Sequence, residues 1–179
     1  MTPAEEFVEF AHAAAPRLRR TAFLLCGDWH AAEDLSQGAL AKVFVSWRRI
    51  RRRDAAYAYA TRTLVNTYLA EKRLKRVDEV LTASVPDRPG VDAGPENRML
   101  VLSALAALPA RARAVVVLRY WEDLSVDQAA EVLGCTPGNI KSQCARALDK
   151  LRAELGGPEV ARPARADARA LGKEAASDG

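Results

Sequence analysis

The spacing of apolar and polar residues predicts a chain built from amphipathic helices. Apolar side chains recur every three or four positions over residues 5–26, 29–47, 55–77 and 97–108, which is the period of a helix with one buried face. Pro16 lies inside the first segment and is expected to break or kink that helix, because proline lacks the N–H for the internal hydrogen bond. The predicted fold class is all-α, and the low aromatic content of 6% agrees with it.

The pattern is most detailed between residues 125 and 151, where it predicts two helices joined by a tight turn. Ser125 and Gln128 have the spacing of a capping box, which begins a helix by satisfying free N–H groups. Gly134 provides the left-handed residue that ends this helix, and Thr136 caps the next one. The buried face of the second helix is predicted to contain Ile140, Cys144, Ala147, Leu148 and Leu151.

The opposite face of this second helix is polar and basic. Its members are Asn139, Lys141, Ser142, Gln143, Arg146 and Lys150. A short helix, a glycine turn and a second helix with a basic outer face form the geometry that enters the major groove of DNA. An ordinary helical hairpin with a solvated face has a similar pattern, but the two caps and the hydrogen-bond donors in the first turns favour DNA binding.

A second basic region precedes and includes the segment 55–77. Five of the seven residues from 48 to 54 are arginine, a density that is also common in solvated loops. Tyr57 and Tyr59 follow directly, and further cations continue along the predicted helix at Arg62, Lys72, Arg73, Lys75 and Arg76. Cations neutralise phosphates, and rings stack on unpaired bases at about 1–3 kcal/mol per base. The combination indicates a platform for single-stranded nucleic acid.

Residues 78–97 differ in composition from the segments on either side. They contain three prolines, two glycines and five acidic residues against a single arginine. Because the prolines interrupt any helix or strand period, the segment predicts a flexible acidic linker. Two small helical domains, at 5–77 and 98–155, are therefore expected to be able to move apart. Residues 156–179 are charged and without a pattern, which predicts a disordered tail.

Composition narrows the function further. The net charge of +4 and the pI near 9.1 suit a polyanionic partner. No apolar stretch is long enough to cross a bilayer and the first residues lack the pattern of a signal peptide, so a cytoplasmic location without membrane insertion is expected. Cys26 with His12 and His30 is an incomplete ligand set, and Cys26 is interpreted as a small core residue. Without a phosphate loop or nucleophile elbow, no catalytic residue, metal, cofactor or enzymatic activity is expected.

Three stretches, in this order, resemble the extracytoplasmic-function sigma factors of bacterial RNA polymerase. The sequence A-E-D-L-S-Q-G-A-L at residues 32–40 is similar to the family's polymerase-clamp motif. The sequence L-V-N-T-Y-L at residues 64–69, before a basic run, resembles its minus-ten promoter segment. Residues 107–134, with the C-T-P-G-N-I-K-S helix after them, resemble its minus-thirty-five domain.

The resemblance implies an initiation factor with three contact surfaces. The β′ clamp of core RNA polymerase would contact Asp34, Leu35, Gln37, Leu40 and Phe44. A flipped base of the non-template promoter strand would bind at Asn66, beside Tyr59, Arg62, Thr67, Lys72 and Arg73. The upstream promoter duplex would meet Thr136, Gly138, Asn139, Lys141, Ser142 and Arg146. Contact with the β flap and an anti-sigma factor as a further partner are also implied.

The chain departs from the family at three of these positions. Gly38 stands where the family usually has glutamate, Asn139 replaces a common threonine, and Gln143 replaces a common arginine. The last change removes a cation from the predicted recognition helix, so the preferred upstream sequence is expected to differ from the usual one.

Other functions fit parts of the sequence. A helix-turn-helix transcription regulator that does not dock on core polymerase would share only the carboxy-terminal motif, and it would need a ligand or phosphoacceptor domain at the front. A protein-interaction adaptor would leave the placement of arginine and lysine without a role. A metal-dependent enzyme using His12, Cys26 and His30 is the weakest of these alternatives.

Overall fold

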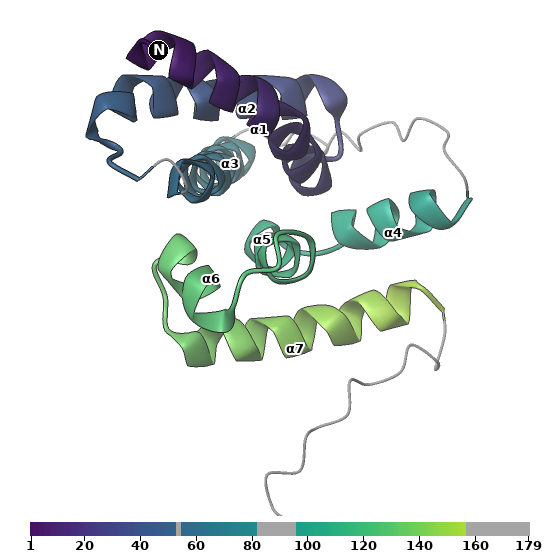
Figure 1. The fold of residues 1–179 in the computed structure, drawn as a ribbon. Coiled ribbons are helices and arrows are strands. Elements are labelled where there is room, and N and C mark those ends of the chain that lie inside the picture. The colour runs from purple at the N-terminus through teal and green to yellow at the C-terminus, as the bar shows by residue number, and fades with distance from the viewer. Residues whose placement is uncertain (53–54, 82–95, 157–179) are drawn as a thin grey trace, which may run out of the picture.

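The structure is a computed structural model that describes residues 1–52, 55–81 and 96–156 (Figure 1). The first unit comprises α1 (Pro3–Cys26), α2 (Trp29–Ser46), the 3-10 turn η1 (Trp47–Arg49) and α3 (Ala56–Leu81). The second unit comprises α4 (Glu96–Ala106), α5 (Ala110–Val116), the π-helical turn η3 (Val117–Trp121), α6 (Val126–Leu133) and α7 (Pro137–Glu154). Every regular element among the described residues is helical, which confirms the predicted all-α class.

The first helix starts earlier than expected and is not broken. Thr2 caps α1 in a capping box, accepting from the Glu5 N–H at 3.3 Å while the Glu5 carboxylate accepts from the Thr2 N–H at 2.7 Å. The predicted break at Pro16 is absent, because α1 continues through it. Pro16 and His12, whose carbonyl loses its internal partner, are both exposed, so water can replace the missing N–H.

The helices extend into the segment that was predicted to be a linker. α3 continues to Leu81 and α4 begins at Glu96, so both enter the range 78–97. Residues 82–95, the middle of the predicted linker, lie outside the described residues, as do residues 157–179 of the predicted tail. Of the helices that the structure describes, none is long and apolar enough to cross a membrane.

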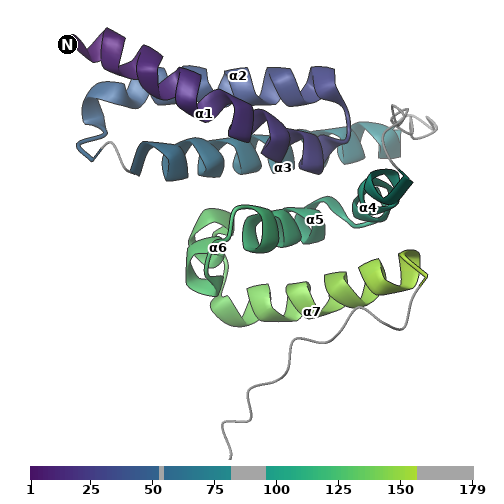
Figure 2. The same cartoon turned by 45° about the vertical axis from the view of Figure 1, so that its right-hand side comes forward.

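The two units are packed together rather than separate. α3 lies between α1 and α2 on one side and α5 on the other, and α6 and α7 complete the second unit (Figures 1 and 2). One continuous apolar core joins them, and its fully buried members include Leu18, Leu25, Val43, Leu64, Val115, Leu118 and Ile140. In this structure, the helices of the two predicted domains therefore share a core.

The helix-turn-helix predicted in the second unit is confirmed. Ser125 Oγ accepts from the Gln128 N–H at 3.1 Å, and Gln128 Oε1 accepts from the Ser125 N–H at 2.8 Å, so the capping box is complete. Gly134 ends α6 in the left-handed conformation, with φ of 59°. The turn that follows is short because Thr136 already caps α7.

We expect Gly134→Ala to lower the free energy of unfolding by about 1–2 kcal/mol, because alanine is strained at positive φ. A Cβ atom at Gly134 would meet no heavy atom within 4 Å, so the cost comes from the backbone alone. Gly138→Ala is the matched control, since a Cβ atom is equally free there and the residue is helical; it should be neutral or stabilising by up to about 1 kcal/mol. Urea unfolding measures both, and equal effects of the two substitutions would contradict this account of the turn.

Candidate nucleic-acid interface

The start of α7 is open to an approaching molecule. Thr136 Oγ1 accepts from the Asn139 N–H at 3.2 Å, and Pro137 occupies the first helical position. Gly138 follows, and the space beside its Cα is empty to 4 Å. Pro137 has no N–H, and the Asn139 N–H is already bonded to Thr136, so a phosphate would approach the helix at Gly138, at the positive end of the helix dipole.

Three exposed residues of α7 carry hydrogen-bond donors. Ile140 and Ala147 are buried, which turns Lys141, Ser142 and Arg146 outward, where all three are exposed. The Arg146 Nε group donates to the Ser142 carbonyl at 3.3 Å, which holds the guanidinium along the helix.

The side chain of Gln143 is bonded within the helix. Its side-chain amide donates to Asn139 Oδ1. Asn139 is exposed and Gln143 is half-buried, and this pair of neutral amides lies on the same side of α7 as Arg146, at steps of four and three residues. Amide groups suit hydrogen bonding to base edges, whereas the cations also suit phosphates.

α3 presents the second candidate surface. Tyr59, Arg62, Asn66 and Arg73 are exposed and follow one another at steps of three, four and seven, so they lie on one stripe. The Tyr59 hydroxyl is within 3.1 Å of Ser46 Oγ, which ties the start of the stripe to the end of α2. The opposite face of α3 is buried in the core, and this burial sets the direction of the stripe.

Two of the predicted strand-binding residues lie beside this stripe rather than on it. Thr67 Oγ1 accepts from Lys42 Nζ at 3.0 Å and therefore points toward α2. Lys72 Nζ lies 5.9 Å from the ring centroid of Tyr68, a cation–π contact on another side of α3. The sequence spacing alone did not separate these positions from the exposed stripe.

A cleft of about 1230 Å³ lies between α3 and the second unit. The α3 side is formed by Asn66, Leu69, Lys72, Arg73, Arg76 and Val77, and the other side by Pro109, Ala110, Arg111 and Leu133. Arg111 Nη2 donates to the Leu133 carbonyl at 3.1 Å, so this cation also caps the end of α6. The described lining contains four cations and no acidic residue, which makes the cleft suited to an anionic chain.

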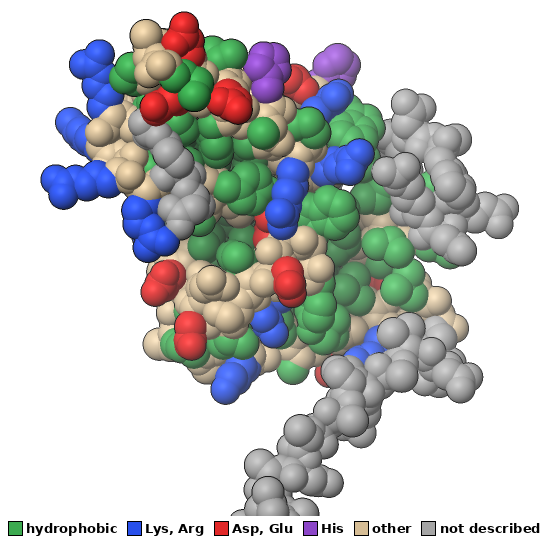
Figure 3. Space-filling model, viewed as in Figure 1, with side chains coloured by type: hydrophobic (Ala, Val, Ile, Leu, Met, Phe, Trp, Pro, Cys, Tyr) green, Lys and Arg blue, Asp and Glu red, His purple; other side chains and the backbone are tan. Residues whose placement is uncertain are grey.

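Arg76 and Arg111 were not among the predicted site residues. The first lies one turn beyond Lys72 on α3, so helical spacing offered a signal for it. The second is brought to the cleft only by packing of the two units. Further cations gather beside the α2–α3 connection (Figure 3), where Arg48, Arg49, Arg51 and Arg52 are exposed.

The predicted polymerase-binding residues divide into two groups. Asp34, Gln37 and Phe44 are exposed, and 54% of the Phe44 side chain is accessible. Leu35 and Leu40 are only 6% exposed and lie in the core, where their side chains hold α2 in place. α1 and α3 cover the face of α2 on which these two leucines lie, and their contact with the β′ clamp stays a prediction.

The exposed residues of α2 continue beyond those predicted. At helical spacing from Asp34 they form a single stripe, Asp34, Gln37, Gly38, Ala41, Phe44 and Val45. Val45 is 83% exposed, and neither it nor Ala41 was predicted from the motif. We call this set the α2 stripe. Its small members, Gly38 and Ala41, and its apolar members, Phe44 and Val45, form a surface suited to packing against a helix of another protein.

The histidine and cysteine residues considered from the sequence form no site here. In the described part of the chain, no group of three or more His, Cys, Asp or Glu side chains is arranged to hold a metal ion. The Cys26 thiol donates to the Asp28 carbonyl at 3.3 Å, and burial raises its pKa above that of a free thiol. A thiol in this state is a poor nucleophile and a poor metal ligand at neutral pH.

Comparisons with known proteins identify the class to which this arrangement belongs. Residues 10–76 match the family model of sigma-70 region 2, and residues 98–151 match that of sigma-70 region 4. The RNA polymerase sigma-E factor of Streptomyces coelicolor is 39% identical over 171 residues, covering 94% of this chain and 93% of that relative. The ECF RNA polymerase sigma factor SigM of Mycobacterium tuberculosis is 33% identical, covering 78% of this chain and 72% of SigM.

A solved structure agrees with this grouping. The sigma factor RpoE of Bartonella quintana, crystallised with the anti-sigma factor NepR, superposes with a TM-score of 0.70 at 25% sequence identity, over 88% of this chain and 99% of RpoE. The chain belongs to the extracytoplasmic-function group of the sigma-70 family of RNA polymerase sigma factors. Proteins of this family are non-enzymatic initiation factors that bind core RNA polymerase and direct it to promoters, and the predicted function is thereby confirmed.

If the Arg146 guanidinium reads a base, we expect Arg146→Ala to weaken binding to duplex DNA by about 1–3 kcal/mol. If it meets a phosphate, the slope of the logarithm of the binding constant against the logarithm of salt concentration should fall by about one. The probe is a duplex that the chain selects from a random-sequence pool. Lys150→Ala is the matched control, because it removes the same charge from the same helix one turn further from its start. Fluorescence anisotropy at several salt concentrations measures both variants, and an equal loss in both would contradict a specific role for Arg146.

Proposed function

We propose that the three exposed surfaces divide promoter recognition among α2, α3 and α7. The chain would act in the cytoplasm, where the polymerase works, and would have no enzymatic activity of its own. The observation that carries the proposal is the α3 stripe, because an exposed amide between two arginines, with a tyrosine on the same stripe and a basic cleft beside it, suits an unpaired base on an anionic strand.

The role proposed for α3 is to hold the opened strand. Extruding a base from a duplex costs a few kcal/mol of stacking and pairing. The Asn66 amide can bond the edge of an extruded base, and the Tyr59 ring can stack on a neighbouring base. Arg62 and Arg73, on the same stripe, can neutralise the phosphates between them. Thr67 and Lys72 lie on either side of the stripe, where Thr67 bonds to Lys42 of α2 and Lys72 contacts the Tyr68 ring, and both would line the edges of this site.

The role proposed for α7 is to bind the upstream duplex. Thr136, Gly138 and Asn139 at its start would meet the sugar–phosphate backbone and set the register. Lys141, Ser142 and Arg146 follow on the exposed face, where they can reach base edges in the major groove. The bonded pair of Asn139 and Gln143 in this face supports a sequence preference different from that of relatives with an arginine there.

The role proposed for α2 is to dock on the β′ clamp. The α2 stripe combines the polar groups of Asp34 and Gln37 with the apolar surfaces of Phe44 and Val45. Such a mixture suits a coiled coil, whose outer surface is charged and whose seam is apolar. The second unit would contact the β flap. On this view residues 5–77 and 98–155 are the functional units, joined by 78–97.

An anti-sigma factor is also proposed as a partner. The Bartonella quintana RpoE structure contains such a partner, and its sigma chain superposes on both units of this one. The alternative function, a helix-turn-helix regulator that does not dock on core polymerase, is not favoured, because residues 10–76 match sigma-70 region 2 and provide no ligand domain.

Run-off transcription with core RNA polymerase on pooled genomic promoter templates tests the function and the docking surface together. We expect new transcription start sites only when the chain is added.

Val45→Asp should weaken binding to core polymerase at least about tenfold, because docking would bury an unpaired carboxylate. Lys42→Ala is the control on the same helix, since its side chain points to α3, and it should bind as the wild type does. Equal binding by both variants would refute docking through the α2 stripe.

Asn66→Ala should bind core polymerase normally but reduce the yield of open complex at least about tenfold, because the extruded base loses its partner. Permanganate reactivity of promoter thymines measures strand opening directly. Glu71→Ala is the matched control, because Glu71 is exposed on a different side of α3 from the stripe. Unchanged opening in the Asn66 variant would refute the placement of the base at this residue.

A further inference from the structure

The cleft between α3 and the second unit gathers positive charge without a matching carboxylate. Lys72, Arg73 and Arg76 of α3 and Arg111 of α5 line it, and we call these residues the cation cluster. In the part of the chain that the structure describes, no acidic side chain pairs with Arg73, Arg76 or Arg111. Because like charges that are held together repel one another, an anion lying among them lowers their electrostatic energy.

The polar groups of the cleft follow one direction. Asn66, Leu69, Arg73 and Arg76 succeed one another at steps of three, four and three residues, so one side of α3 lines the cleft. At a rise of about 1.5 Å per residue, this line is about 15 Å long. Across from it, Arg111 Nη2 donates to the Leu133 carbonyl at 3.1 Å. That bond uses one N–H group of the guanidinium fork and limits where the others can point.

Most of the remaining lining of the cleft is apolar. The apolar residues come from α3, from the start of α5 and from the end of α6: Leu69, Val77, Pro109, Ala110 and Leu133. Asn66 adds a single neutral amide at one end of the α3 line. An apolar lining with a few polar groups is usual for small-molecule sites of about 300–1,000 Å³, and the cleft, at about 1230 Å³, is large enough for such a ligand.

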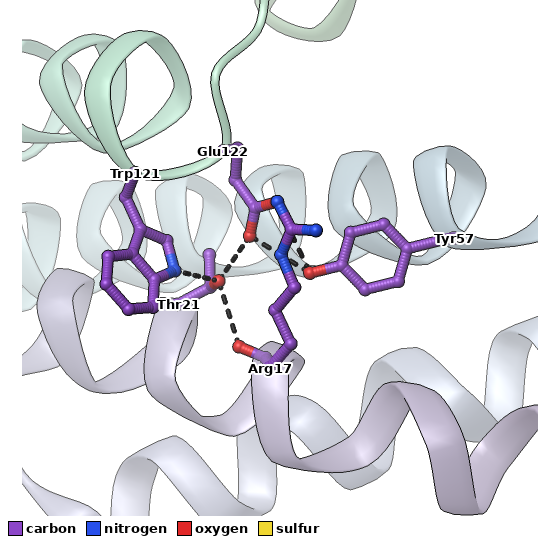
Figure 4. Close-up of polar contacts among 5 residues, drawn as sticks. All are labelled: Arg17, Thr21, Tyr57, Trp121 and Glu122. Carbon is purple, nitrogen blue, oxygen red and sulfur yellow. Dashed lines mark hydrogen bonds and ion pairs between the residues drawn. The ribbon is translucent and has the colours of Figure 1, made fainter.

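Polar contacts between the units hold the two sides of the cleft in place. Glu122, which directly follows η3, is only 6% exposed. Its carboxylate accepts from the Tyr57 hydroxyl at 3.1 and 3.3 Å, and Arg17 Nη2 lies 3.0 Å from Oε2 (Figure 4). On α5, Arg113 Nη1 donates to the Leu25 carbonyl of α1 at 2.6 Å. A site whose walls are already positioned loses less entropy when a ligand binds.

We propose that the cleft binds a nucleoside polyphosphate. Phosphate groups supply the negative charge that the cation cluster lacks, and a guanidinium fork can bind two phosphate oxygens at once. The flat faces of a nucleobase can lie against Leu69 and Leu133, with the Asn66 amide at the edge of the base. The two chemically different parts of this ligand therefore match the two kinds of lining.

The consequence for strand binding rests on the proposed role of α3. Asn66 and Arg73 belong both to the α3 stripe and to the lining of the cleft. A bound nucleotide then occupies part of the surface proposed for the opened strand, so each ligand lowers the affinity of the other. The concentration of free nucleotide would thus set the fraction of the chain that can hold a strand.

Equilibrium dialysis of the full chain against radiolabelled GTP and ATP tests the site. We expect one nucleotide to bind per chain, at least about tenfold more tightly than inorganic triphosphate, because the base adds apolar contact. Guanosine, which lacks phosphate, should not bind measurably. Binding of neither nucleotide would overturn the proposal. So would equal affinity for GTP and inorganic triphosphate, because the apolar lining would then hold no base.

Variants on the two sides of the cleft locate the bound nucleotide. Arg76→Gln and Arg111→Gln should each weaken GTP binding at least about fivefold, because each removes a charge-assisted hydrogen bond. Lys75→Gln is the matched control, since it removes the same charge from an exposed position on α3 outside the cleft lining. Circular dichroism verifies that the variants keep the helical content of the wild type. An equal loss in all three variants would overturn the proposal, because the attraction would then be general.

A competition experiment separates this site from the proposed role of α3. GTP should displace a fluorescent single-stranded promoter oligonucleotide from the wild type, and higher GTP concentrations should be needed with Arg111→Gln. GTP binding that is lost in the cleft variants, but that displaces no oligonucleotide, would support the nucleotide site and refute instead the placement of the strand on α3.

Discussion

The burial of α3 between two layers of helices is the constraint on which the rest of the structure depends. Leu64, Val65 and Tyr68 are almost fully buried, so α1 and α2 cover α3 on one side and the second unit packs on the other. Once these faces are buried, the direction of Tyr59, Arg62 and Asn66 is no longer free. A rigid helix with a fixed exposed stripe can place an amide and two cations at set distances, which a flexible basic segment cannot do without an entropic cost.

The same packing joins the two units through both apolar and polar contacts. The apolar core that joins the units stabilises their association, because it removes apolar surface from water. The polar contacts of Glu122 and Arg113 define how the units meet, since each requires particular groups at hydrogen-bond distance.

Much of the second unit could be predicted from sequence, because its signals are local. The capping box at Ser125, the glycine at 134 and the cap at Thr136 act within one helical turn, and each was found where expected. The exposed residues of the first unit were harder to predict from the sequence. Leu35 and Leu40 belong to the same motif as Asp34 and Gln37, yet they are buried, and Thr67 and Lys72 lie off the stripe that contains Asn66. Helical spacing predicts which residues share a face, but not which neighbour covers it.

The sequence by itself determined the helical class, the helix-turn-helix and the basic and aromatic character of α3, because these follow from periodicity, capping and composition. Only the tertiary structure decided that the units share a core and that Glu122 is buried. Its partners Thr21 and Tyr57 are 101 and 65 residues away along the chain. Contacts at such separations depend on which helix faces meet, and that choice is made by the packing of the whole chain.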